Sequence, residues 1–279
     1  MKHDVGAYYD QTQNHYQRWW HLREGMALHY GLWDKHTASF VEALDNMNKY
    51  LAGLAKIKPA EQVLDAGCGV GGAAIYLARE YQVQVTGITL SDLQVQTATA
   101  NAARHQVQQQ VQFMRQDYTA TNFPDQHFDL IWACESSSSA PDKQVMANEW
   151  FRLLKPGGRL VLTDFFKTGT LSGPNQQMLA QWSDLWAMSP LVTPDYLQQC
   201  LERSGFAVKH THNLTSGIVK TARRMYWSYW LGLLPSVVYN TFLGARPYAR
   251  HHYKSGLYQY RALQKKLWAY HSFLAAKPA

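Results

Sequence analysis

An aspartate and four glycines stand together at residues 65–72, DAGCGVGG, directly behind the apolar pair Val63-Leu64. A strand that leads through a glycine-rich turn into a helix brings backbone N–H groups and a helix N-terminus close to a ligand. Asp65 precedes the first of these glycines, Gly67, by two residues, where a carboxylate would repel a pyrophosphate and attract a cationic amino group. The stretch therefore predicts a nucleoside-type ligand that carries a cationic end rather than a diphosphate.

The glycine spacing alone does not identify that ligand. Gly67, Gly69 and Gly72 satisfy the G-x-G-x-x-G pattern, which is about equally expected of dinucleotide sites and of other nucleoside sites. After the second predicted strand, however, the chain continues with Thr89 and Leu90, so the acid that usually binds the ribose of a nicotinamide cofactor is missing. A nicotinamide oxidoreductase is therefore a minor alternative.

The elements that must position this loop follow from the hydrophobic pattern. From about residue 60, short apolar runs alternate with longer amphipathic stretches, which predicts a parallel sheet covered by helices. We expect strands at 62–66, 82–88, 111–115, 128–133, 159–165, 205–212 and 270–276. We expect helices at 72–81, at 91–105 with Ser91 as its cap, at 146–154, ended by Pro156-Gly157-Gly158, and at 193–204, begun by Thr193-Pro194.

The composition is that of a folded protein in a reducing compartment. The chain has 279 residues, of which 46% are hydrophobic and 17% charged. Its three cysteines, Cys68, Cys134 and Cys200, are far apart and form no CxxC pair, so we expect neither a disulfide framework nor a metal site. The opening MKHDVGAYYD lacks the apolar run of a signal peptide, and we expect a cytoplasmic location, with membrane association as an alternative.

The net charge of +7 and the pI near 9.2 suggest nucleic acid, acidic lipid or a phosphorylated small molecule as partner. The positive residues are most frequent between Lys209 and Lys266, where they alternate with Tyr and Trp and form no Lys/Arg block. This distribution favours an anionic or membrane-adjacent acceptor over RNA.

Several motifs together resemble the class I S-adenosylmethionine-dependent methyltransferases, in particular the small-molecule subgroup with tocopherol, sterol and sugar O-methyltransferases. They are VLDAGCGVGG at 63–72, GITLSDLQ at 87–94, Asp117, FDLIWACES at 128–136 and LLKPGGRLVLTDF at 153–165, and LHYGLWD at 28–34 is also similar. In order and spacing they cover roughly residues 60 to 210. The resemblance implies an α/β Rossmann-like fold with a seven-stranded, mostly parallel sheet, and S-adenosyl-L-methionine as cofactor.

The resemblance also implies a role for each cofactor-binding position. Asp65 and the loop of Gly67, Gly69 and Gly71 would hold the methionyl end and let the adenosyl part approach. A tight turn without a ligand is the alternative for these glycines.

The remaining cofactor positions follow the second and third strands. Thr89, Leu90 and Gln94 would contact the cofactor, with the hydroxyl of Ser91 helping to replace the ribose-binding acid. Asp117 would accept a hydrogen bond from the adenine amino group, with Tyr118 beside it. A surface position for Gln94 and a solvated strand-end acid for Asp117 are the alternatives.

Three residues are catalytic candidates by the same resemblance. Methyl transfer from a sulfonium is an in-line displacement, so a base is needed only if the acceptor must lose a proton. Glu135 would lie next to the cofactor methyl group, where it also counts as a cofactor contact, and Asp164 would assist deprotonation or else cap a loop. His29 is a third candidate base, with a packed, hydrogen-bonded histidine as the alternative.

One position departs from the relatives. The pattern EATCHAPD or ESLHHMPD is replaced here by ESSSSAPD at residues 135–142, with Ser139 in place of a histidine. This favours an acceptor that is already nucleophilic, such as an electron-rich alkene, an activated ring carbon or an amine.

Two aromatic-rich blocks lie outside the alternating pattern. We expect one domain, residues 1–279, made of an N-terminal helical lid (1–50), a cofactor-binding core (51–213), a helical acceptor cap (214–267) and a final strand (268–279). Lid side chains would either pack over the cofactor or stabilise a cation by about 0.5 to 2 kcal/mol each. They are Tyr9, Tyr16, Trp20 and Trp33.

The second block contains 19 residues without a charge, Met225 to Leu243. A membrane span is disfavoured because the chain must return to add a final strand and because Pro235 and Ser236 interrupt the apolar run. A helical cap that lines an apolar acceptor pocket is the first interpretation. The second is an interfacial helix with peripheral membrane contact through residues 223–250, whose arginines (Arg223, Arg224, Arg246 and Arg250) would touch anionic headgroups or a substrate phosphate.

These observations predict methyl transfer from S-adenosyl-L-methionine to a hydrophobic small molecule, isoprenoid-derived or an aromatic natural product, at carbon or a heteroatom. The acceptor would be neutral, anionic or phosphorylated, and the oligomeric state stays open. A nucleic-acid methyltransferase is an alternative that lacks an added RNA-binding module or an Asn-Pro-Pro-Tyr-like motif. A non-catalytic protein that binds the cofactor is the other alternative.

Overall fold

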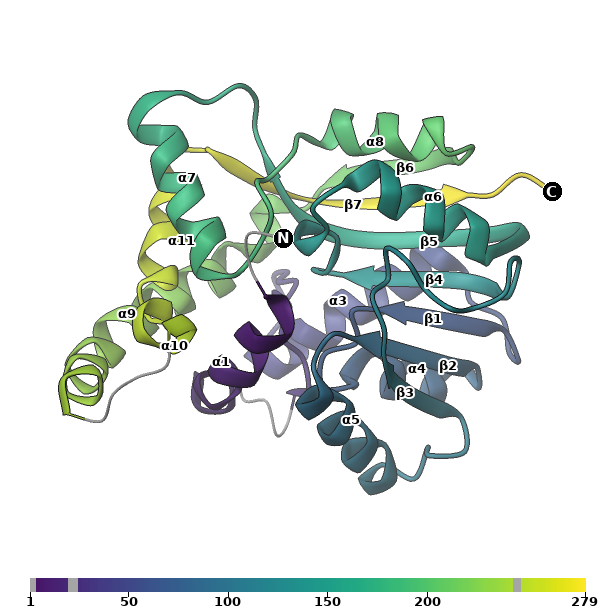
Figure 1. Ribbon diagram of the computed structural model, residues 1–279, viewed down its shortest axis with the longest axis horizontal. Coiled ribbons are helices and arrows are strands. Elements are labelled where there is room, and N and C mark those ends of the chain that lie inside the picture. Colours follow the sequence, from purple (N-terminus) through teal and green to yellow (C-terminus); the bar gives the residue numbers. More distant parts are fainter. Residues whose placement is uncertain (1–3, 20–24, 243–246) are drawn as a thin grey trace.

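A seven-stranded sheet forms the centre of the protein in the computed structural model, which describes residues 4–19, 25–242 and 247–279 (Figure 1). The strand order is β3-β2-β1-β4-β5-β7-β6. All pairs are parallel except those of β7, which runs antiparallel to both β5 and β6. The strands are β1 Gln62–Ala66, β2 Gln84–Thr89, β3 Val111–Arg115, β4 Phe128–Cys134, β5 Leu154–Lys167, β6 Ala207–Asn213 and β7 Trp268–Ala276. The predicted Rossmann-like, mostly parallel sheet is confirmed.

Helices cover both faces of the sheet, as a parallel sheet requires. Adjacent residues of β1 point to opposite faces: Val63 packs into the core cluster that contains α3 and α4, and Leu64 into the cluster that contains α6 and α8. The bounds of these helices are α3 Phe40–Ala55, α4 Gly72–Tyr81, α5 Asp92–Arg104, α6 Lys143–Leu153 and α8 Pro194–Arg203.

The sequence predicted the bounds of several elements closely and those of α6 and β5 less well. The bounds of β1, β3 and α4 are those expected, and Ser91 and Thr193 cap α5 and α8 as expected. The helix expected at 146–154 begins instead at Lys143, because the Asp142 side chain accepts hydrogen bonds from two N–H groups of the first turn. The expected stop at 156–158 was wrong, since β5 already begins at Leu154.

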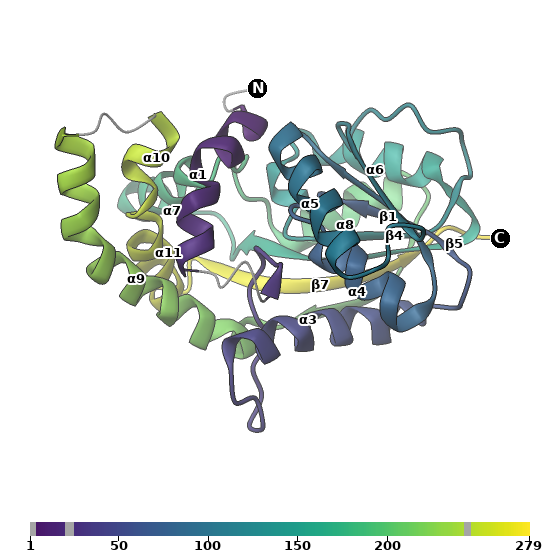
Figure 2. The ribbon, with the colours of Figure 1, turned by 90° about the horizontal axis from the view of Figure 1, so that it is seen from below.

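A second group of helices stands beside one end of the sheet (Figures 1 and 2). It comprises α7 Gly173–Leu185, which was not predicted, and the insertion between β6 and β7 with α9 Thr215–Phe242, α10 Pro247–His252 and α11 Ser255–Gln264. Helix α1, Val5–Trp19, lies between this group and α5 and contacts both α10 and α5. Within the described ranges, no helix has the length and hydropathy needed to cross a bilayer.

The N-terminal lid boundary expected at residue 50 falls inside a helix. α3 spans Phe40–Ala55 and packs against β5 and β7, so this helix is part of the covered sheet rather than of a separate lid. The side chains of Tyr16, Trp20 and Arg246, which the sequence singled out, lie outside the described residues.

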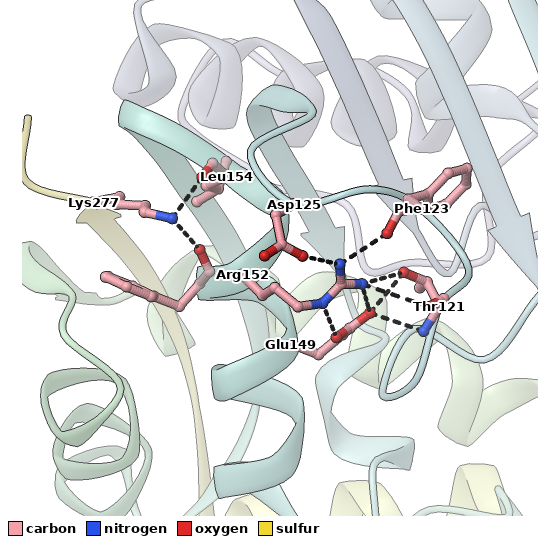
Figure 3. Close-up of polar contacts among 8 residues, drawn as sticks. Thr121, Phe123, Asp125, Glu149, Arg152, Leu154 and Lys277 are labelled. Carbon is pink, nitrogen blue, oxygen red and sulfur yellow. Dashed lines mark hydrogen bonds and ion pairs between the residues drawn. The ribbon is translucent and has the colours of Figure 1, made fainter.

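An arginine-centred network joins the loop after β3 to the end of α6 (Figure 3). The Arg152 guanidinium donates to Glu149 Oε1 and Oε2 at 2.7 and 2.8 Å, to Asp125 Oδ1 at 2.6 Å and to the Phe123 carbonyl at 2.8 Å. Lys277 adds the C-terminal segment by donating to the carbonyls of Phe151 and Leu154. The network ties together the segments that lead into the amino ends of β4 and β5, whereas the glycine loop follows the carboxyl end of β1.

We expect Arg152→Ala to lower the free energy of unfolding by about 2 kcal/mol, because several charge-assisted hydrogen bonds are lost and Glu149, whose side chain is 11% exposed, keeps an unpaired charge. Arg115→Ala removes an ion pair with Asp92 in which the two side chains are 60% and 67% exposed. This change should lower the free energy of unfolding by less than about 1 kcal/mol. Chemical denaturation of both variants measures the difference. Equal losses would contradict a structural role for the network.

Candidate active site

A cavity opens at the carboxyl ends of β1 to β5, where open α/β sheets bind ligands. It encloses about 1330 Å³ of empty space, including the mouth that is continuous with solvent. Residues of α1, of the segment before α3 and of the loop after β4 complete its wall. The sequence-predicted residues that line it are His29, Asp65, Gly67, Gly69, Thr89, Leu90, Gln94, Asp117, Tyr118 and Glu135, whereas Gly71 and Asp164 do not line it.

The glycine loop has a conformation that side chains rarely adopt. Gly67 has φ +100°, and a Cβ there would lie 2.4 Å from Cβ of Ser136, so the loop after β4 can approach only a glycine. Gly71 has φ +88° and forms the N-cap of α4. Gly71 therefore supports the turn, and its part in the site is indirect.

The carboxylate of Asp65 is buried on the cavity wall without full pairing. The side chain is 2% exposed, and within the described part of the chain Oδ2 has no hydrogen-bond partner. Burial raises the pKa of Asp65 to about 7, and the Ala74 backbone N–H only partly opposes this shift. Asp65 lines the cavity, and a buried acceptor oxygen that lacks a donor suits a cationic ligand group.

Polar side chains beside β2 form the next part of the wall. Gln94 is 3% exposed and accepts from the Thr89 hydroxyl at 2.6 Å, while its backbone N–H donates to Ser91 Oγ at 3.0 Å. The alternative of a surface helix residue for Gln94 was therefore wrong. The Ser91 hydroxyl donates to Oδ1 of Asp10 in α1. The sequence has no acid directly after β2, but the fold brings this carboxylate there from 81 residues before Ser91.

The residues after β3 are held by local bonds. Asp117 Oδ1 accepts from the backbone N–H and the hydroxyl of Thr119 at 2.8 and 2.7 Å. The Tyr118 hydroxyl donates to the Ser136 carbonyl at 2.6 Å. Asp117 is thus both a strand-end cap and a part of the cavity wall, and the two interpretations of this residue are compatible.

Glu135 stands at the end of β4 in a strained backbone conformation. Its φ of +53° is unusual for a residue with a side chain. Oε1 accepts from the Tyr30 N–H at 2.6 Å and from the Tyr270 hydroxyl of β7 at 2.7 Å. Burial raises the pKa of Glu135 well above its usual range, and these two donors oppose the shift. The structure therefore orients this carboxyl through β7 and the N-terminal segment together.

His29 lies on the same wall as a neutral base. The side chain is 6% exposed and Nδ1 is 3.0 Å from the Tyr30 carbonyl oxygen. Because a carbonyl only accepts, Nδ1 carries the proton and Nε2 is the basic nitrogen. Burial lowers the pKa of His29 below its usual value, which keeps the imidazole neutral near pH 7.

Asp164 has a structural role in the loop after β4. Oδ2 accepts from the Ser137 hydroxyl and from the Ser138 N–H, both at 2.7 Å, and Oδ1 from the Phe165 N–H at 2.8 Å. From the other side, Lys143 Nζ donates to carbonyls of Ser137 and Ala140. The geometry favours the loop cap over the expected base, because both carboxylate oxygens are occupied. Lys143 had no signal in the sequence.

Apolar and aromatic residues form the rest of the wall, among them Phe165, Trp186 and Met188. Around Phe165, five aromatic rings have centroids 5.1 to 5.7 Å away, those of Tyr30, Trp182, Trp186, Trp268 and Tyr270. Tyr8 and Tyr9 of α1 also line the cavity, and burial beside Glu135 raises the pKa of Tyr9 to about 12. No described residue of 214–267 lines it, so the acceptor-cap interpretation of that segment loses its support.

The sheet order, the glycine loop and the unpaired acid at the carboxyl edge define an α/β domain that binds a nucleoside cofactor. A family model described as Methyltransferase domain matches residues 63–158. O-methyltransferase cnsE from Penicillium expansum is 33% identical over 74% of this chain and 72% of its own length. The chain belongs to the class I S-adenosylmethionine-dependent methyltransferases, and S-adenosyl-L-methionine is the cofactor of that family.

Two further comparisons agree with this family. 2-Methyl-6-phytyl-1,4-hydroquinone methyltransferase from Synechocystis sp. is 35% identical over 55% of this chain and 48% of its own length. The chain aligns with only 43% to 61% of the length of four such relatives. The cyclopropane synthase MmaA2 from Mycobacterium tuberculosis has 16% identity and a TM-score of 0.82, with 98% of this chain and 97% of that chain covered, a likeness that shows the fold.

The residues of the cavity fit the family's cofactor. Asp65 offers a carboxyl oxygen without a donor among the described residues for an ammonium group, and Gly67 and Gly69 line the cavity beside it. Thr89 and Gln94 present a hydroxyl and an amide on the adjoining wall.

We expect affinity for S-adenosyl-L-methionine to increase from about pH 5.5 to about pH 7.5, by up to about tenfold per pH unit below pH 7, because only ionised Asp65 attracts the ammonium group. The raised pKa also means that the cofactor-free fold loses stability as pH rises from about 4 to about 7. Asp65→Asn should bind weakly and lose the pH dependence of binding. Titration calorimetry measures both effects.

Asp45→Asn is the matched control, because Asp45 lies on α3 and burial raises its pKa too, but it does not line the cavity. An affinity for the cofactor that is unchanged in Asp65→Asn, or that falls with rising pH in the wild type, would contradict the assignment.

Proposed function

We propose that this chain transfers the methyl group of S-adenosyl-L-methionine to a hydrophobic small molecule, isoprenoid-derived or aromatic, at a carbon or a heteroatom. One observation carries the proposal: a single cavity joins the polar wall of Asp65, Thr89 and Gln94 to the apolar wall of Phe165, Trp186 and Met188. The first wall suits a nucleoside with a cationic end, and the second suits an apolar acceptor. The relative from Synechocystis supports this class, since its name describes an acceptor with a phytyl chain on an aromatic ring.

The chain's own residues would mainly bind and orient. The cofactor supplies an electrophilic methyl group on a sulfonium. Asp65 would hold the ammonium end, Gln94 and Thr89 the ribose hydroxyls, and Asp117 the adenine amino group. Tyr8 and Tyr9 of α1 would exclude water from the cavity. Orientation and a dry, preorganised site are the largest contributions that a protein can make to such a displacement.

Proton transfer would fall to the residues near the apolar wall. His29 is neutral with Nε2 unprotonated, so it would serve as base for an acceptor that must lose a proton. Burial raises the pKa of Glu135 well above its usual range, and the Tyr30 N–H and the Tyr270 hydroxyl hold this carboxyl in the cavity wall. Ser139 lines the cavity where relatives carry a histidine, which leaves His29 as the candidate base.

The anionic or phosphorylated character of the acceptor stays an expectation. With the acceptor-cap interpretation of residues 214–267 unsupported, peripheral membrane contact through residues 223–250 is the interpretation that we retain for this segment.

The proposal predicts that cofactor with an isotope-labelled methyl group, incubated with the protein and a whole-cell extract of its native cells, labels an organic-soluble product one methylene heavier than its precursor. Mass spectrometry identifies that product, and Asp65→Asn serves as the inactive control. Label in the nucleic-acid fraction would instead support the nucleic-acid alternative. Cofactor binding with no label in any fraction would support a non-catalytic protein.

If that product shows that the acceptor loses a proton, His29→Gln should lower kcat by about 10²- to 10⁴-fold and remove the acidic limb of the pH profile of kcat, while the KM for the cofactor stays near that of the wild type. A steady-state pH profile of both proteins measures this. Asp164→Asn is the comparison: it should lower thermal stability, because Asp164 accepts from Ser137 and Ser138 of the loop 136–139, called the serine loop, and it should keep the shape of the pH profile. A His29→Gln enzyme with the wild-type rate would exclude His29 as base.

A further inference from the structure

The second half of α9 exposes an apolar face. Leu231 is 66% exposed, Leu234 72% and Trp227 57%. Trp230, Val237 and Val238 are exposed as well. Their spacing of three, four and seven residues places Trp227, Trp230, Leu231, Leu234 and Val238 on one side of the helix, which we call the α9 stripe. Side chains of this size exposed together mark a contact surface.

The opposite side of α9 is already packed. Ile218, Ala222 and Met225 are buried, and Gly256 of α11 lies so close to the Met225 carbonyl that a Cβ would be 2.2 Å from its oxygen. Tyr226 contacts Tyr260 of α11 at a ring distance of 5.0 Å. The α9 stripe is therefore a second apolar face of a helix whose first face packs within the fold; Figure 2 shows α9 beside α11 and reaching beyond it.

Positive side chains continue the same side of the helix toward its N-terminus. Lys220, Arg223 and Arg224 precede Trp227 by seven, four and three residues and are exposed. The surrounding sequence has a marked charge bias: residues 203–279 contain twelve Lys and Arg and no Asp or Glu, whereas residues 1–202 contain all 20 acidic residues. One side of α9 thus presents cations first and apolar side chains after them.

We propose that the α9 stripe docks on the surface of an anionic lipid bilayer. The leucines and valines enter the boundary between headgroups and acyl chains, Trp227 and Trp230 lie at headgroup depth, and the cations meet lipid phosphates. The charge bias favours an anionic bilayer over a second copy of the chain as the partner of the α9 stripe. A second copy of the chain would bring two acid-free segments face to face, and like charges would oppose that contact.

Docking through α9 would also place the covered cavity near the bilayer. α10, which follows α9, holds α1 through the Tyr8 hydroxyl and His252 Nε2 at 3.0 Å and through the Tyr248 N–H and Gln11 Oε1 at 3.1 Å. Val5, Tyr8 and Tyr9 of α1 line the cavity. A cavity in this place could take its acceptor from the bilayer. That statement rests on the proposed function, whereas the docking of α9 does not.

The test is sedimentation of the full chain with vesicles of phosphatidylglycerol and phosphatidylcholine in equal parts, against vesicles of phosphatidylcholine alone. We expect binding to the anionic vesicles that weakens with added salt. The double variant Leu231→Glu, Leu234→Glu should bind roughly 10- to 100-fold more weakly. Val145→Glu, at an exposed valine of α6, is the matched control and should bind as the wild type does.

Two readouts separate this inference from its competitors. All three proteins should keep the same thermal shift with S-adenosyl-L-methionine, so loss of vesicle binding is not loss of the cofactor site. The inference is overturned if the wild type does not bind anionic vesicles, or if the double variant binds them as strongly as the wild type does. A dimeric wild type that the double variant converts to a monomer, as measured by light scattering, would show that a second copy covers the stripe.

Discussion

The constraint on which the site depends is a buried carboxyl oxygen with nothing to accept from within the described chain, Oδ2 of Asp65. Leaving a buried polar group unsatisfied costs about 1 to 3 kcal/mol, and the fold carries this cost near the end of β1, an interior strand of the sheet. β1 pairs with β2 and β4 on either side, which fixes the carboxyl at the cavity wall. Protonation lowers the cost below about pH 7, whereas above it a cationic donor is needed, so part of the selectivity for a cationic ligand lies in this one atom.

Burial of a charge is not by itself a sign of function, as the comparison of Asp65 with Asp164 shows. Both are almost fully buried and in both burial raises the pKa. The oxygens of Asp164, however, accept three hydrogen bonds from the serine loop and its neighbour, and Lys143 holds the carbonyls of the same loop. Asp164 and Lys143 are both hydrogen-bonded to the loop between them and so fix its shape. The carboxylate of Asp65 lacks such partners at one oxygen among the described residues, which leaves that oxygen for a ligand.

Sequence reasoning predicted what depends on near neighbours. The glycine loop, the caps Ser91 and Thr193 and the bounds of β1 and α4 follow from local spacing. Contacts between distant segments had no such signal: Asp10 reaches Ser91, and Tyr270 orients Glu135 across 135 residues. α9 is apolar on two sides, and periodicity cannot tell which side a neighbour covers. Its packing against α11 shows which side is covered, and the cavity lining, which includes no described residue of 214–267, removes the support for the acceptor-cap interpretation.

The net charge of +7 is the sum of two regions of opposite character, a cavity with acidic side chains and a C-terminal segment with basic ones. The cavity contributes carboxyl groups, Asp65, Asp117 and Glu135, to a wall on which no described Lys or Arg stands. The positive charge belongs instead to the C-terminal quarter of the chain, around α9 to α11. A nucleic-acid acceptor would have to cross from that cationic surface into an acidic, aromatic cavity covered by α1, so the charge that suggested it lies away from the chemistry. A neutral, apolar acceptor meets no such conflict, because the cationic surface then serves to position the protein and the acidic cavity serves the cofactor.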